Sequence, residues 1–247
     1  MRMHLYRMAL ILSAAALATA AGIGFVLARL PEADIEKLAL QATQGRMSAD
    51  WQLRVAAALG NGAALRARGI GLLRRDDPTA TLEGIAVLTA AAQGGHHGAA
   101  LDLGRWYFLG GIARVPDHAA ARPWLTQAAR QQPAAAYYLA LIANNAPAGH
   151  ADKALALAHL QQAAAGGIAA AQFLLANAYR DGLGVSSDAA AARHWLQEAA
   201  MRDHPGALQA LAQAFAHGEL GLARDDHQAN LLFGLAAEAL RDPPVTP

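Results

Sequence analysis

The chain has 247 residues and no cysteine, and it holds few charged or aromatic residues. Without cysteine there is no disulfide, no thiol nucleophile, and no zinc or iron–sulfur site built on thiolates. Charged residues make up 16%, with a formal net charge of +1, so the basic excess typical of nucleic-acid binding is missing. Aromatic residues make up 6%, and this scarcity disfavours sandwiches and barrels.

Alanine is abundant and fills about a quarter of the chain. It is the strongest helix former, and its small side chain lets helices approach closely. Hydrophobic residues reach 55%, and the low share of charged residues argues against disorder. We therefore expect an all-α protein of closely packed helices.

The first thirty residues contain a long uncharged run, residues 8–28, with two arginines before it and Arg29 after it. The run is long enough to span a bilayer as a helix. We interpret residues 1–30 as a signal anchor whose N-terminus stays in the cytoplasm, following the positive-inside rule. A cleaved signal peptide is the alternative, because residues 18–20 (Ala-Thr-Ala) fit a small-x-small cleavage site. A buried core helix is a further alternative.

The rest of the chain repeats itself every 35–37 residues. The sequences WLTQAA, HLQQAA, WLQEAA and LFGLAA begin at positions 124, 159, 195 and 232. An aspartate stands seven residues before each of them: Asp117, Asp152, Asp188 and Asp225. Aspartate is a preferred helix N-cap, so each should begin the second helix of a hairpin. A fainter copy, VLTAAA at 87–92, has Ala80 at the aspartate position.

A first helix is expected upstream of each aspartate, because apolar residues recur there at helical spacing. The clearest sets are Ala100, Leu103 and Tyr107; Ala171, Leu175 and Tyr179; and Ala207, Leu211 and Phe215. The sequence DGLGV at 181–185 is typical of a turn that reverses the chain. One hairpin cannot bury its apolar face alone, so stacked hairpins forming a solenoid are expected. Trp124 and Trp195, at matching places in second helices, should be core residues.

These residues together form the pattern A-x-x-x-L-G/A-x-x-Y, a G-x-G-V turn, an aspartate and A-x-x-W-x-x-x-A-A. The pattern resembles the Sel-1-like repeat family, which is related to the tetratricopeptide repeats. The copy at 171–200 is the clearest and that at 99–129 is nearly as good, whereas those at 135–164 and 207–237 are degenerate. The resemblance implies a right-handed α-solenoid over residues 62–240.

Some residues depart from the family pattern: Ala143 replaces the tyrosine, Leu232 replaces the tryptophan, and Pro123 lies inside a second helix. Residues 31–61 lack the pattern, and we expect them to form a capping helix pair over 32–43 and 49–59, with Ser48 as the second N-cap. The end of the chain, residues 241–247 (RDPPVTP), is too proline-rich for a helix and should be loose.

The sequence contains no recognisable catalytic motif. His96 and His97 are adjacent, so they do not face each other on a helix, and neither has a third ligand at i+4. The serines outside the anchor lack a nucleophile motif, and nothing holds two carboxylates at a glycosidase spacing. We predict no catalytic residue, cofactor or metal.

A binding role remains, because the first helices of such solenoids line a concave side that usually binds partners. The candidates are first-helix positions between the core residues: Asp102, Arg105, Trp106, Tyr138, Asn177, Arg180, Gln209 and Gln213. Arg105 and Trp106 lead, since arginine and tryptophan are enriched at interface hot spots.

The leading hypothesis is a non-enzymatic scaffold, anchored in a bacterial inner membrane by residues 8–28. Its solenoid would lie in the periplasm and bind a protein or peptide. An accessory subunit of a respiratory or transport complex is the alternative, docking through a transmembrane helix rich in small residues. An enzyme acting on cell-wall glycan or peptide would need a convergent acid, base or nucleophile, which the sequence does not offer.

Overall fold

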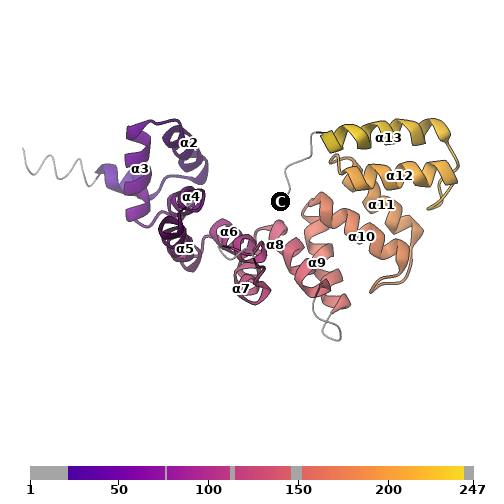
Figure 1. Ribbon diagram of the computed structural model, residues 1–247, viewed down its shortest axis with the longest axis horizontal. Helices are drawn as coiled ribbons and strands as arrows, with labels where there is room; N and C mark the ends of the chain where they lie inside the picture. The colour runs from indigo at the N-terminus through magenta and orange to yellow at the C-terminus, as the bar shows by residue number, and fades with distance from the viewer. Residues whose placement is uncertain (1–21, 76, 112–114, 146–151, 242–247) are drawn as a thin grey trace, which may run out of the picture. The chain divides into compact units, whose positions relative to one another are not determined.

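The computed structural model describes residues 22–75, 77–111, 115–145 and 152–241, and regular structure in these ranges is helical. A helical segment at 22–28 comes first. The following helices are α2 (Glu32–Thr43), α3 (Met47–Ala58), α4 (Gly62–Leu73), α5 (Pro78–Gln93), α6 (His97–Phe108), α7 (His118–Ala128), α8 (Pro133–Asn144), α9 (Lys153–Ala165), α10 (Ala169–Asp181), α11 (Ala189–Ala200), α12 (Pro205–His217) and α13 (Asp226–Arg241) (Figure 1). The all-α solenoid expected from the repeat is confirmed.

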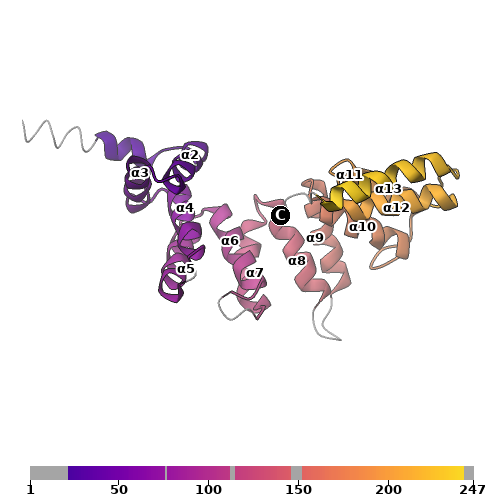
Figure 2. The same ribbon diagram turned by 45° about the horizontal axis from the view of Figure 1, so that its top comes forward.

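The helices form two compact units. The first comprises residues 1–106 and 110–115, and the second comprises 107–109 and 116–247. Within the second unit, α12 and α13 run side by side, as do α8 and α9 (Figures 1 and 2). The even repeat period predicts one continuous array, whereas the structure divides it into two units.

The periodic aspartates cap the second helices, as predicted. Backbone N–H groups donate to their carboxylates at 2.9–3.0 Å: Ala120 to Asp117, Leu155 to Asp152, Ala190 and Ala191 to Asp188, and His227 and Gln228 to Asp225. The faint copy has a cap too, because Asp77 accepts from the N–H of Ala80 at 2.8 Å. The sequence pattern indicated that this copy lacks the capping aspartate, because Ala80 stands at the periodic place; the aspartate is present three residues earlier, where α5 begins.

The tryptophans of the second helices are only partly buried, which corrects the prediction that they form the core. Leu125 and Leu196, the next residues along, are 0% and 1% exposed. The second helices therefore turn their leucines to the interior, where closely spaced alanines leave little room for an indole. Trp195 packs instead between two neighbouring clusters, one around Leu175 and one around Leu211.

The first two full helices match the expected pair, but the cap assigned to Ser48 is wrong. Helix α3 begins at Met47 with Arg46 at the N-cap and no side-chain capping bond, so Ser48 lies inside the helix. Helix α7 continues across Pro123 from His118 to Ala128.

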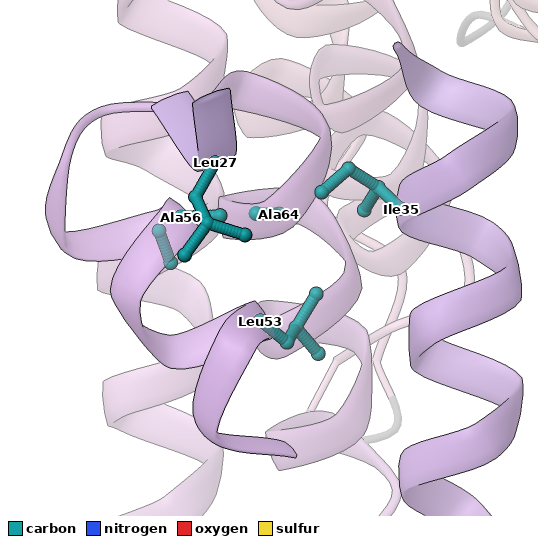
Figure 3. Packing of buried hydrophobic residues seen from close by; sticks show 6 residues of the cluster. Leu27, Ile35, Leu53, Ala56 and Ala64 are labelled. Carbon is teal, nitrogen blue, oxygen red and sulfur yellow. The ribbon is translucent and has the colours of Figure 1, made fainter. Parts of the chain in front are cut away.

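Residues 22–28, the end of the predicted anchor, belong to the first unit. Leu27 is 6% exposed and joins a cluster with Ile35, Leu53 and Ala64 (Figure 3). None of the helices within the described ranges is long and apolar enough to cross a membrane. Residues 1–21 of the predicted anchor and 242–247 of the predicted tail lie outside those ranges, whereas Arg241, assigned to that tail, is the last residue of α13.

Candidate functional site

A groove of about 780 Å³ in the first unit is the candidate functional site. It lies over α2, α3 and α4, with Glu83 of α5 at its edge. Ile35 and Leu53, which are buried in the core of the unit, lie beneath the groove, and Leu40, which is 60% exposed, contributes apolar surface. Charged side chains surround this surface: Arg54, Arg66, Arg68, Arg74 and Arg75, together with Glu32, Glu36, Asp50 and Glu83.

Helical spacing explains how α4 supplies so much of the lining. Ala63, Arg66, Ala67, Ile70 and Arg74 recur every three or four residues, so they share the face turned to the groove. The opposite face of α4 is buried in the unit. One helix thus serves both as core and as groove wall.

Arg66 organises the charges at one end of the groove. Its Nε donates to Asp102 of α6 at 2.6 Å, and its Nη1 donates to Glu32 of α2 at 3.3 Å. Burial of the guanidinium works against its charge, but the hydrogen bond to Asp102 and the nearby carboxylates outweigh burial and raise the pKa of Arg66. These two ion pairs link α4 to α6 and to α2, which are the first helices of three successive hairpins.

Other arginines of the groove differ in how they are paired. Arg68 donates to Glu83 at 2.7 Å, and Arg54 lies 3.7 Å from Asp50. Arg74 and Arg75 are exposed at the end of α4 and form no ion pair with any residue in the described ranges. These two guanidiniums can therefore meet a carboxylate from a partner.

His96 beside the groove serves as a helix cap, a role that the sequence analysis missed. Its Nδ1 accepts from the N–H of Ala99 at 3.1 Å, and His204, three repeat periods later, accepts from Ala207 at 3.2 Å. Burial lowers the pKa of both histidines. Within the ranges that the structure covers, no three His, Cys, Asp or Glu side chains gather where they could hold a metal.

The predicted binding residues are divided between the two units. Asp102, Arg105 and Trp106 lie on α6 and are partly buried, and Asp102 is engaged by Arg66. Tyr138 is 7% exposed, which corrects its assignment to the surface. Its ring packs edge-on against Phe108, with 5.1 Å between ring centroids.

The remaining four candidates lie on α10 and α12 of the second unit. Asn177 is partly buried, whereas Arg180, Gln209 and Gln213 are exposed. Arg180 is paired with its neighbour Asp181 at 2.8 Å. The groove over α2–α4 includes none of the eight predicted residues, because the repeat pattern used to choose them is faint or absent there.

The comparisons with known proteins agree with the repeat assignment. The Sel1 repeat model matches residues 97–133, 169–204 and 205–239. The last of these matches includes Leu232, so the departure from tryptophan does not remove that copy. No curated protein matches the chain.

Two solved structures share the fold. A Sel1 repeat protein from Oxalobacter formigenes aligns with a TM-score of 0.73 and 22% identity over 85% of this chain and 88% of that one. A protective antigen with an SLR fold from uropathogenic Escherichia coli aligns with a TM-score of 0.70 and 22% identity over 84% of this chain. This chain covers 46% of that antigen. The matches show that the chain contains Sel1 repeats, and the two structures show that it shares their fold.

Proposed function

We propose that the protein is a membrane-tethered scaffold that binds a protein or peptide segment in the groove over α2–α4, without catalysis. Sel1 repeat proteins are generally interaction scaffolds. The observation that carries the proposal is the groove itself, with its apolar surface beside two exposed arginines.

The groove suits a peptide for two physical reasons. Its walls are preformed helices, so binding orders little of the scaffold. Apolar contact with Leu40, which is 60% exposed, and with Ile70 would supply affinity, while Arg74 and Arg75 would select a segment that carries acidic residues.

The tether is proposed from the sequence. The uncharged run at 8–28, with more arginine before it than after it, would place the solenoid outside the cytoplasm of a bacterium. A partner would then be a periplasmic protein or the periplasmic part of a membrane complex.

Site-specific photocrosslinking in the cells that make the protein tests the groove. A photoreactive amino acid replaces Leu40 or Gly71, which line the groove, and Leu82 serves as the control. Leu40 and Leu82 are 60% and 63% exposed, but only Leu40 lines the groove. We expect partner adducts from positions 40 and 71 and not from 82. Equal labelling at all three positions, or none at 40 and 71, would refute the proposal.

A blocking variant tests the same site by loss of binding. A side chain added at Gly71 meets nothing within 4 Å, and the same holds at Gly234 on α13. Gly71→Leu should therefore obstruct the groove and lower partner recovery at least tenfold, while Gly234→Leu should leave recovery unchanged. Unchanged recovery with Gly71→Leu would show that the partner binds elsewhere.

The accessory-subunit alternative has its own discriminating test. Residues 8–21 are exchanged for an unrelated apolar span, which leaves the buried Leu27 in place. Association that survives the exchange supports the groove, whereas loss of association supports docking through the membrane segment.

A further inference from the structure

The segment at residues 22–28 is apolar on both its inner and its outer side. On the inner side, Leu27 points into the cluster with Ala56 and Ala64 (Figure 3). On the outer side, Ile23, Phe25 and Val26 are 52%, 60% and 59% exposed. The outer side carries no polar side chain to favour contact with water.

The segment is attached firmly to the first unit. The Asn61 side chain is 8% exposed, and its Nδ2 donates to the carbonyls of Leu30 at 3.0 Å and Ala28 at 3.3 Å. Its Oδ1 accepts from the N–H of Ala64 and caps α4. Only residues 29–31 separate the segment from α2. A flexible linker is therefore absent between residue 22 and the first unit.

Two observations indicate that lipid covers the outer side. Residues 8–21, which come directly before the segment, contain no charge, so the apolar surface continues the run proposed as the tether. The first charge after that run is Arg29, and its guanidinium lies 4.3 Å from the centroid of the Phe25 ring. An arginine next to an aromatic ring at the end of an apolar helix is typical of the boundary between hydrocarbon and headgroups.

We infer that the outer side of residues 22–28 lies in the lipid at the membrane surface while the inner side forms part of the protein core. Residues 22–28 and the rest of the first unit then move as one rigid body seated on the bilayer. This inference rests on the proposed tether. Ile35 and Leu53 belong to the cluster of Leu27 and also line the groove, so the groove is held within about two helix diameters, ~20 Å, of the lipid. Its ligand would be a segment that emerges from the membrane nearby.

Single cysteines test the inference cleanly, because the chain has none of its own. Phe25→Cys and Val26→Cys carry an environment-sensitive nitrobenzoxadiazole dye, with Met201→Cys, 68% exposed in the second unit, as the control. The full chain is reconstituted into phosphatidylcholine–phosphatidylglycerol vesicles. We expect the dyes at 25 and 26 to be quenched by spin-labelled lipid and shielded from aqueous iodide, and the dye at 201 to behave in the opposite way.

Vesicle flotation separates this inference from the tether. Protein that floats with vesicles while its dyes at 25 and 26 are quenched by iodide retains the tether and overturns the seating on lipid. Protein that does not float overturns both. Dyes shielded from iodide but not quenched by lipid would show a protein helix, from a partner or a second copy, on this side, and would also overturn the inference.

The rigid attachment has a separate readout. Asn61→Ala removes the bonds to Ala28 and Leu30, so a spin label at position 25 should gain mobility while flotation persists. Asp77→Ala is the matched control, because it removes the cap of α5 without touching the segment. Equal label mobility in both variants would show that Asn61 does not hold the segment in place.

Discussion

Two glycines on α4 should respond in opposite ways to replacement by alanine. A Cβ added at Gly69 would lie 2.6 Å from Cγ of Leu88 and 3.2 Å from the carbonyl oxygen of Gly84 on α5. Leu88 is 0% exposed, so it has no free space into which to move. A Cβ added at Gly71, half a turn away, meets nothing within 4 Å.

The magnitudes follow from these surroundings. Either change gains helix propensity of about 1 kcal/mol, and this gain cancels when the two variants are compared. Overpacking at Gly69 costs about 1–3 kcal/mol. Gly71→Ala should therefore stabilise α4, and Gly69→Ala should be less stable than Gly71→Ala by about 1–3 kcal/mol.

Hydrogen exchange on α4 and α5 in the full chain is the appropriate assay. It reports local opening, whereas a global melt of a two-unit chain need not be two-state. Exchange in α13 serves as an internal reference and should not change. Leu88→Ala should cost less in the Gly69→Ala background than in the native chain, because it removes the clash. Equal protection of α4 and α5 in the two glycine variants would refute the close approach of these helices.

Three further predictions concern single side chains. Asp203, between α11 and α12, has a φ of +54°, so Asp203→Gly should stabilise this connection by up to ~1 kcal/mol, read as slower hydrogen exchange in α11 and α12, and faster exchange would contradict the left-handed backbone there. Asp102→Ala leaves a half-buried guanidinium on Arg66 without its closest partner and should cost about 1.5–3 kcal/mol, read as faster exchange in α4 and α6. The caps formed by His96 and His204 need neutral rings, and their lowered pKa means that the unfolded chain binds these protons first as pH falls. The stabilisation by these caps should be complete above the ordinary pKa of 6.5 and should be lost as pH drops through the lower pKa values of the folded chain. His204→Asn should therefore make the melting temperature fall less between pH 8 and pH 5, and an unchanged fall would contradict a role for the neutral His204 ring.

The candidate site was harder to predict from sequence than the fold. The groove residues of α2–α4 lie where the repeat pattern is faint or absent, so no matching positions in other copies pointed to them. Arg66 and Asp102 stand 36 residues apart, one repeat period, but the period alone does not show that their side chains meet. Tyr138 occupies a position that helical spacing assigns to the surface, yet Phe108 covers it.

The sequence by itself determined that the chain is helical, where the second helices begin, and the period at which hairpins recur. These features depend on interactions within one or two turns: an aspartate carboxylate accepts from N–H groups two or three residues ahead, and apolar side chains share a face at helical spacing. Tertiary structure alone decided how far each helix is rotated, so that Leu125 rather than Trp124 faces the interior, and where the array divides into two units. It also decided that Leu27 joins the core and that α2–α4 enclose a groove. Such outcomes depend on how side chains distant in sequence fill a shared volume at close-packed density, which no local pattern specifies.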